Sequence, residues 1–303
     1  MSDNGPGSGD TVALVTGATG GIGSAVALRL ARKGFRVIGV GRDPRRGEGV
    51  LSELRDVRPL EGRYASDHLF LPTDLSLMSE TAALAAEVAT HTDRVDALVC
   101  CAGNLAFRPE WTREGLERAF ALNYLSRFVL IAHLLPMLLR APSGRVVLVA
   151  NAGRYRDTLD LEDPNYHHGR RGLRVSTRTQ FANDLLAVEL ADRHQATPLE
   201  VSCVFPGVVR TDLFRNAVGV PGPLSRLLAV LPARTGLPPE VAADTPAWLA
   251  ASAEARHISG SFYGPCRSRR QVPAAAGRAE RREALWRTTE NLVARWLPAK
   301  VSP

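Results

Sequence analysis

The sequence predicts an α/β fold, with a doubly wound parallel sheet that carries helices on both faces. Two observations lead to this prediction. Short apolar runs alternate with segments of helical spacing along most of the chain, as expected for parallel strands joined by crossover helices. A glycine-rich turn separates the first apolar run from the first helical segment. Because the 303 residues contain no internal repeat and no convincing linker, we expect a single domain.

The apolar runs give the expected strands, six of them buried and parallel and the last at the edge of the sheet. They cover residues 11–16, 35–40, 69–71, 97–101, 145–150, 200–205 and 259–263. Helical spacing is found over residues 24–33, 81–90, 113–139, 177–193 and 248–251. The segment 113–139 fits one long helix or two successive helices, and Pro136 is expected to kink or end it.

The domain is expected to span residues 11–265, after a disordered leader over residues 1–10. The segment 213–239 follows the sixth strand and holds an apolar stretch between Pro and Gly residues. We interpret it as a lid over a pocket, with a helix docked on the core as the alternative. Residues 266–303 are expected to extend the same domain with an amphipathic helix, indicated by Leu285, Trp286, Leu292, Val293 and Trp296.

The net charge of +7 comes almost entirely from arginine, since Lys33 and Lys300 are the two lysines of the chain. No nucleic-acid-binding motif accompanies the arginines, which favours a solvated surface over a nucleic-acid footprint. We find no apolar run of membrane-spanning length, and the first ten residues lack a signal-peptide pattern. We therefore expect a cytoplasmic protein that binds a small molecule, with no nucleic acid and no membrane as partner.

The four cysteines are Cys100, Cys101, Cys203 and Cys266. Their spacing fits no metal site, so we expect no metal and interpret them as buried free thiols. Cys100 and Cys101 are adjacent in an apolar run, and their side chains should therefore point to opposite faces of a strand.

The glycine-rich turn reads Thr-Gly-Ala-Thr-Gly-Gly-Ile-Gly over residues 16–23. Glycines at 17, 21 and 23 let the backbone turn tightly and approach a pyrophosphate, which then meets the free N–H groups of the following helix. The pattern follows an expected strand and opens an expected helix, which is the context that a dinucleotide-binding Rossmann fold requires. The candidate cofactor-binding residues of this turn are Gly17, Thr19, Gly20, Gly21, Ile22 and Gly23.

Further motifs follow in order along the chain: Asp74-Leu75, Cys101-Ala102-Gly103, Asn123, and a Pro-Gly loop over 206–211. Together they resemble the short-chain dehydrogenase/reductase family over roughly residues 11–265, and the segment 112–139 is most similar to its retinol-dehydrogenase branch. The resemblance implies that Asp74 and Leu75 contact the adenine and that Asn123 is the helix asparagine of the active site. It further assigns to the cofactor Cys101, Ala102, Gly103, Asn123, Pro206, Gly207, Val209 and Thr211.

The choice between NAD and NADP depends on Gly41-Arg42-Asp43, which follows the second expected strand. An acidic residue there binds the ribose hydroxyls of NAD, whereas an arginine offers a planar guanidinium to the 2′-phosphate of NADP. Asp43 therefore argues for NAD and Arg42 for NADP. The resemblance to family members with Cys-Arg-Asp at this position favours NADP(H), with Arg42 as a ligand.

The positions of the family's Ser-Tyr-Lys machinery carry other residues. The resemblance places Asn151, Ser176 and Gln180 there, and Asn123 completes the set of candidate catalytic residues. In the family the lysine charge lowers the pKa of the tyrosine, which donates the proton. A shift in alignment register would not restore the lysine, because Lys33 ends the first expected helix and Lys300 is in the tail. Asn151 can still donate a hydrogen bond to a carbonyl oxygen.

Substitute donors are conceivable between these positions, where the chain carries Tyr155, Tyr166, His167 and His168. A histidine would exchange a proton near neutral pH. We favour an exposed polar loop for this segment, and we interpret Tyr124 as a helix packing residue.

These observations predict an NADPH-dependent ketoreductase in which substrate or water supplies the proton. A ketone beside a phenol suits this chemistry, as in angucyclinone or anthraquinone polyketides, and the departures are similar to those of tailoring ketoreductases in bacterial antibiotic pathways. The alternatives are an inert NADP-binding scaffold or redox sensor and a non-redox cyclase. Family members commonly pair through two helices, so residues 113–139 and 177–193 are candidates for a homodimer contact.

Overall fold

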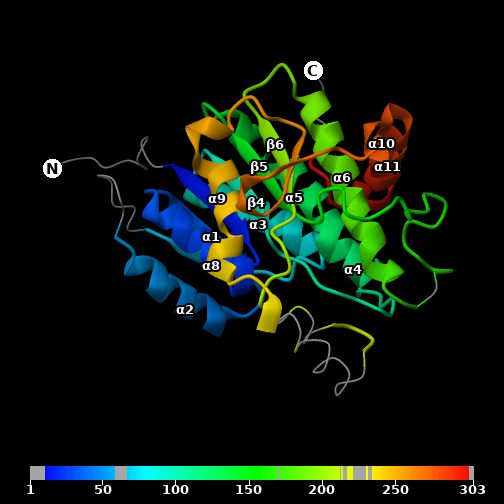
Figure 1. Cartoon of the computed structure of the whole chain (residues 1–303), viewed down its shortest axis with the longest axis horizontal. Coiled ribbons are helices and arrows are strands. Elements are labelled where there is room, and N and C mark those ends of the chain that lie inside the picture. The colour runs from blue at the N-terminus through cyan, green and yellow to red at the C-terminus, as the bar shows by residue number, and fades with distance from the viewer. Residues whose placement is uncertain are drawn as a thin grey trace.

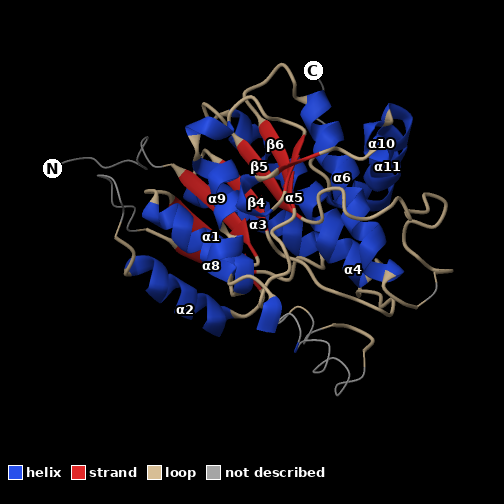
Figure 2. Ribbon diagram, in the orientation of Figure 1, coloured by secondary structure: helices blue, strands red, loops and turns tan. Residues whose placement is uncertain are grey.

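An eight-stranded sheet forms the centre of the molecule (Figures 1 and 2). The computed structural model describes residues 11–58, 67–169, 171–211, 213, 217–220, 230 and 234–299. The strand order is β3-β2-β1-β4-β5-β6-β7-β8, so the order reverses between β1 and β4, as in a doubly wound sheet. The strands are β1 (Val12–Thr16), β2 (Arg36–Gly41), β3 (Leu69–Pro72), β4 (Ala97–Cys100), β5 (Arg145–Val149), β6 (Glu200–Val204), β7 (Ser261–Tyr263) and β8 (Arg269–Arg270). The predicted fold class is confirmed.

The first seven strands pair in parallel, and β8 returns antiparallel to β7. The prediction that the last strand before residue 265 forms the edge was therefore wrong, because β8 covers it. A two-residue strand of arginines has no apolar alternation, so the sequence pattern gave no signal for it.

Two hydrophobic cores lie on opposite faces of the sheet, because successive strand residues point to opposite sides. One core packs the sheet against the helices α3 (Met78–His91), α5 (Ser126–Leu139), α6 (Arg174–Arg193) and α11 (Ala279–Val293). The other packs it against α1 (Gly21–Arg32), α2 (Pro44–Arg55) and α9 (Asp244–Ala251). Short helices α8 (Pro239–Ala242) and α10 (Ala274–Gly277) complete the two layers. Cys100 belongs to the first core and Cys101 packs against the second, as predicted.

The helical run 118–139 consists of three parts: α4 (Arg118–Phe120), a π-helical turn (Ala121–Leu125) and α5. Pro136 was expected to kink or end the helix; because it lies inside α5, which continues to Leu139, the second of these alternatives was wrong. By length and composition this run could also cross a membrane, contrary to the sequence reading, but 67% of its apolar window is buried inside the fold. It lies against α3 and α6 as a core helix.

Two further differences separate the structure from the sequence reading. Helix α2 was not predicted; Asp43 accepts hydrogen bonds from the N–H groups of Arg45 and Arg46 at its start, and Pro44 occupies its first turn. Cys266 is exposed, not buried. The apolar stretch of the expected lid lies almost wholly outside the described residues, as do residues 1–10. The amphipathic C-terminal helix is confirmed as α11.

Candidate functional site

A cavity of about 670 Å³ opens at the carboxyl ends of the parallel strands. Its walls come from the loops after β1, β2, β3, β4, β5 and β6 and from the start of α6. Ligands of doubly wound sheets bind at this edge, next to the point where the strand order reverses. The topology therefore brings together candidate residues that are up to 194 positions apart in the sequence, from Gly17 to Thr211.

The glycine turn leaves room for a pyrophosphate. Gly17 has a φ of +69°, and a Cβ there would lie 2.9 Å from Ala102 Cα. A Cβ on Gly23 would lie 2.2 Å from the carbonyl oxygen of Gly17, so the turn and α1 pack too closely for a side chain. A Cβ on Gly20, by contrast, would meet nothing within 4 Å. Gly20 is the N-cap of α1 and provides no side-chain cap, so the first-turn N–H groups stay available to an anion.

The candidate phosphate side of the cavity carries arginines. Arg42 and Arg46 both line it, and Arg46 was not singled out from the sequence. The Asp43 carboxylate caps α2 and lies 3.7 Å from the Arg46 guanidinium. Asp43 does not line the cavity, so its carboxylate is engaged at the helix start. The dinucleotide cradle of glycines and arginines thus fits a phosphorylated, anionic cofactor.

Of the two residues predicted to contact the adenine, one lines the cavity and the other does not. Leu75 lines the cavity together with Thr73 and Ser76. Asp74 does not line it: its Oδ1 accepts hydrogen bonds from the N–H and the hydroxyl of Ser76, 3.0 and 2.7 Å away. Asp74 therefore shapes this wall through the turn that it closes, and its contact with adenine stays a prediction.

The predicted nicotinamide side meets the glycine turn at the other end of the cradle. The cavity wall there includes Cys101, Ala102, Gly103, Pro206, Gly207, Val209 and Thr211. A Cβ on Gly21 would lie 2.8 Å from the Thr211 methyl carbon, which shows how closely the two loops approach. Burial raises the pKa of the Cys101 thiol, so it remains protonated at neutral pH.

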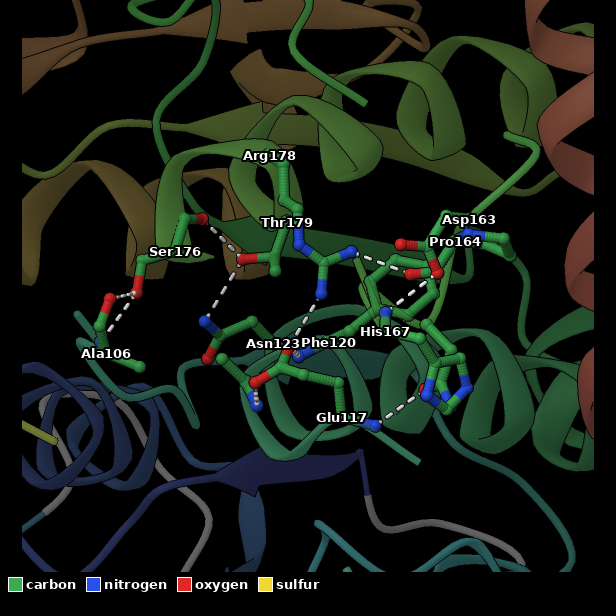
Figure 3. A network of polar contacts seen from close by, with 12 residues as sticks. Ala106, Glu117, Phe120, Asn123, Asp163, Pro164, His167, Ser176, Arg178 and Thr179 are labelled. Carbon is green, nitrogen blue, oxygen red and sulfur yellow. Dashed lines mark hydrogen bonds and ion pairs between the residues drawn. The ribbon is translucent and has the colours of Figure 1, made fainter. Parts of the chain in front are cut away.

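Three of the four candidate catalytic residues, Asn151, Ser176 and Gln180, line the cavity. The Ser176 hydroxyl is occupied on both sides: it accepts a hydrogen bond from the N–H of Ala106 at 2.6 Å and donates one to the carbonyl oxygen of Ala106 at 3.1 Å (Figure 3). With 3% of its surface exposed, Ser176 ties α6 to the loop after β4. Its hydroxyl is poorly placed to serve as a proton donor.

Asn123 is fully buried in the π-helical turn and does not line the cavity. Its Oδ1 accepts from the N–H of Asn104 at 2.8 Å, and its Nδ2 donates to the Asn104 carbonyl oxygen and to Thr179 Oγ1, both at 3.1 Å (Figure 3). Its own carbonyl oxygen accepts from Asn183 Nδ2 at 2.9 Å. Asn123 therefore positions the cavity wall and α6, and a direct contact with a cofactor stays a prediction.

The residues considered as substitute proton donors lie in different environments. Tyr155 is half-buried and lines the cavity. Tyr166 is 7% exposed and packs its ring on the Arg178 guanidinium at 4.4 Å, and His167 stacks on Trp111. His168 is exposed beside Asp163. The prediction of an exposed polar loop was thus wrong for Tyr166, while Tyr124 packs in the core as predicted, with its hydroxyl 2.9 Å from Thr289 Oγ1.

A buried ion pair below the cavity was missed by sequence reasoning. Arg178 Nη2 and Glu117 Oε2 are 2.6 Å apart, and each side chain is 1% exposed. Arg178 also donates to the carbonyl oxygen of Pro164 at 2.7 Å (Figure 3). Glu117 caps α4 by accepting from two backbone N–H groups. The pair joins α4, α6 and the loop before α6, and no short-range spacing links residues 61 positions apart.

Two further buried charges lie beneath the catalytic positions. Arg127 of α5 lines the cavity with 4% of its surface exposed. Asp184 of α6 is 1% exposed and accepts from the N–H of Gly153 at 2.9 Å. Burial raises the pKa of Asp184 to about 7. Both residues belong to helices rich in apolar residues, α5 and α6. The sequence alone did not show that these two side chains are buried near the cavity.

Comparisons with known proteins agree with the geometry. The family model for short chain dehydrogenase matches residues 11–158. The chain is 33% identical over 283 residues to the human "Dehydrogenase/reductase SDR family member 13", covering 92% of this chain and 72% of that protein. It is 31% identical over 274 residues to "Putative daunorubicin C-13 ketoreductase DnrU" of Streptomyces sp. (strain C5), covering 88% and 86%.

A solved structure of a Mycobacterium paratuberculosis protein superposes with a TM-score of 0.70 at 26% identity, covering 97% of both chains. The sheet order, the glycine cradle and these likenesses all lead to one assignment. The chain belongs to the short-chain dehydrogenase/reductase family, whose members are oxidoreductases that use nicotinamide cofactors.

Proposed function

We propose that the chain is an NADPH-dependent ketoreductase that reduces a ketone on a polycyclic aromatic, angucyclinone-like substrate, with the proton supplied by substrate or water. The observation that carries the proposal is the composition of the cavity. It joins a complete dinucleotide cradle to Asn151, Ser176 and Gln180, and its described lining contains neither lysine nor histidine. The cavity therefore suits a cofactor that carries hydride, but its described lining lacks the Tyr–Lys pair that donates the proton in the family.

NADP is favoured over NAD by the charges at the cradle. Arg42 and Arg46 face the cavity, and the carboxylate of Asp43 is engaged at the start of α2. Five arginines and one glutamate stand in the described lining, a balance that suits an anionic cofactor (Arg42, Arg46, Arg118, Arg127, Arg154 and Glu110). Arg42 and Arg46 would hold the phosphates, and the cofactor would supply the hydride.

A flat, apolar substrate is favoured by the other half of the cavity. Its apolar wall residues include Leu105, Leu122, Phe205, Val208, Leu213 and Val218. Val208 and Leu213 are 51% and 40% exposed, more than is usual for large apolar side chains, and a polycyclic ligand would cover them. The likeness to a protein named as a daunorubicin C-13 ketoreductase supports a substrate of this class.

The proton balance closes without an enzyme donor. As hydride reaches the carbonyl carbon, the electron pair of the C=O π bond moves to oxygen, and a neighbouring phenol of the substrate transfers its proton to that oxygen. The phenolate then recovers a proton from water. Asn151 lines the cavity, and its amide Nδ2 can donate a hydrogen bond that orients the carbonyl oxygen.

Tyr155 is the one alternative donor that the cavity offers among the described tyrosines. Tyr155→Phe should therefore reduce kcat by less than about threefold if the substrate supplies the proton, against a loss of about 10²-fold or more if Tyr155 is the general acid. Single-turnover rates with a phenolic polycyclic ketone measure this directly.

Asn151→Ala is expected to lower the single-turnover rate by about tenfold, as for the loss of one neutral hydrogen bond.

The experiment that tests the proposal is turnover with NADPH and a panel of phenolic polycyclic ketones, followed by NADPH absorbance and product mass. Reduction adds two hydrogens and consumes one NADPH per product. A product of unchanged mass without NADPH consumption would indicate a cyclase. Tight NADPH binding without any turnover would indicate an inert cofactor-binding protein, and either result would refute the reductase.

A further inference from the structure

We propose that Arg127 provides a buried positive charge at the catalytic end of the cavity, where the family's lysine position carries Gln180, and that it stabilises negative charge on an oxygen of the bound substrate. The inference deepens the proposed function and rests on it for the identity of the ligand. It concerns a residue of α5 that none of the sequence motifs includes.

The position of Arg127 follows from its hydrogen bonds. Its Nη2 donates to the carbonyl oxygens of Ala102 and Val149, 3.1 and 2.9 Å away. Its Nη1 donates to Asn183 Oδ1 at 3.0 Å. Ala102 follows β4 and Val149 ends β5, so the guanidinium lies between the carboxyl ends of the two central strands, and all three of Arg127, Ala102 and Val149 line the cavity.

The charge of Arg127 has no carboxylate to neutralise it among these partners. All three acceptors are neutral amide oxygens, and the Nε atom is buried with no hydrogen-bond partner. The titratable groups that face it are the thiols of Cys100, Cys101 and Cys203, whose pKa values are all raised by burial, so they stay neutral. Burial lowers the pKa of Arg127, yet a guanidinium remains protonated at neutral pH.

An unneutralised buried cation changes what the neighbouring cavity binds best. Removing a charge from water is unfavourable unless an opposite charge approaches it, so a ligand oxygen that gains negative charge is stabilised. Asn183 extends the contact, because its Nδ2 donates to the carbonyl oxygens of Asn123 and Thr179. Arg127 is thereby fixed against α6, the helix that carries positions 176 and 180, and Gln180 itself has no charge.

Arg145 provides a matched control. It too is a buried arginine whose hydrogen bonds go to backbone carbonyl oxygens, those of Leu249, Ser252 and Ala255. It is 6% exposed, against 4% for Arg127. However, it stands at the amino end of β5, away from the cavity, and Glu200 lies near enough to oppose its charge. Substituting it removes a similar set of buried contacts without changing the charge of the site.

The test is the ionisation of a bound phenol, a readout that needs no turnover. A nitronaphthol is titrated by its visible phenolate absorbance, free and bound to the NADPH complex of each variant. At an effective dielectric constant of about 20 and a separation of about 8 Å, the cation should lower the bound phenol pKa by about one to two units. An apolar cavity without the cation would raise that pKa by desolvation.

We expect wild type and Arg145→Met to lower the phenol pKa, Arg127→Met to raise it relative to both, and Arg127→Lys to restore the lowering. A wild-type complex that leaves the phenol pKa unchanged or raised would overturn the inference, even if Arg127→Met fails to fold. Equal phenol pKa values in folded Arg127→Met and wild type would overturn it as well.

The two proposals fail in different ways. If wild type lowers the phenol pKa and Arg127→Met raises it, but wild type reduces no ketone, the reductase is refuted and the charge role stands. If wild type reduces phenolic ketones but Arg127→Met leaves the phenol pKa unaltered, the reductase stands and the charge role is refuted.

Discussion

Ser176 illustrates how a single position can lie in the active-site wall without being free to react. Its Oγ exchanges two hydrogen bonds with the backbone of Ala106, and 3% of its surface is exposed. An aliphatic hydroxyl is also far less acidic than a phenol, so geometry and chemistry agree. At the residue scale, the cavity lining therefore includes residues such as Ser176 that hold the wall in place, besides those that are free to contact a ligand.

Ser176→Ala should consequently affect stability more than catalysis. The substitution leaves the N–H and the carbonyl of Ala106 buried without their partner, which costs about 1–3 kcal/mol of unfolding free energy. The catalytic rate per folded molecule should stay within about threefold of wild type, since the hydroxyl donates no proton. Urea unfolding and single-turnover kinetics measure the two effects, and a 10³-fold loss of rate in fully folded protein would contradict this account.

Arg42 and Arg46 should decide the preference for NADPH over NADH. Replacing either by alanine removes a charge-assisted contact to the 2′-phosphate, so the Kd for NADPH should rise by about 10- to 100-fold while the Kd for NADH changes little. Arg45→Ala is the control, because Arg45 precedes Arg46 in α2 but does not line the cavity. Fluorescence titration gives both constants; an equal loss for NADH and NADPH would place the arginines elsewhere.

At the scale of elements, α6 is held to its surroundings by buried charges. Arg178 joins it to α4 and to the loop at Pro164 (Figure 3). Its guanidinium carbon also lies 4.8 and 4.4 Å from the ring centroids of Phe120 and Tyr166. Asp184 joins it to the turn after β5, where Ala152 and Gly153 adopt φ values of +38° and +79°. Because Asn151 and Tyr155 flank this turn, α6 fixes both walls of the catalytic end.

Glu117→Gln should destabilise the fold strongly, since it leaves the Arg178 guanidinium buried without its anion. Breaking a buried pair from one side costs about 3–5 kcal/mol. Glu283→Gln is the matched control on α11, because its pair with Arg287 is exposed and 3.8 Å long. Such a surface pair contributes less than about 1 kcal/mol. Equal urea midpoints for the two variants would show that the buried pair is unimportant.

Asp184 should make the unfolding free energy fall as the pH rises. The folded protein keeps its proton up to about pH 7, whereas the ordinary carboxyl pKa of 3.8 applies to the unfolded chain. Between these values the folded state binds more protons, so its stability is greatest at low pH and is lost toward pH 7. Between pH 5 and 7 the loss should approach about 2 kcal/mol. Urea unfolding of Asp184→Asn should lack this loss; an unchanged pH dependence would contradict the assignment.

At the scale of the whole molecule, the sequence predicted the sheet well because apolar runs mark parallel strands buried on both faces. It also singled out the glycine turn that lines the cavity, since glycine spacing next to a strand and a helix is a local signal. It could not predict β8 or α2, which lack apolar periodicity, nor the contacts of Glu117, Arg127, Arg178 and Asp184. Those depend on which residues the topology brings together, up to 61 positions apart for the Glu117–Arg178 pair.

The same topology gives the molecule its proposed chemistry, because one edge of one sheet holds the glycine turn, an apolar wall and a catalytic end with neither lysine nor histidine among the described lining residues. Orientation of hydride donor and ketone can supply much of a rate enhancement without an enzyme acid. The substrate then has to carry the group that completes the reaction. The dependence of the rate on that group is therefore the property that distinguishes this site from a reductase with its own donor.

The most direct measurement is the ratio of kcat/KM for a polycyclic ketone with a free neighbouring phenol to that for its methyl ether, with binding of the ether checked as competitive inhibition. The methyl ether keeps the ring system and removes the proton. A general acid contributes about 10²- to 10⁴-fold, so we expect the phenol to react at least about 10²-fold faster. Equal kcat/KM values for two ligands that bind equally well would show that the protein or bulk water supplies the proton, and would contradict the substrate as its source.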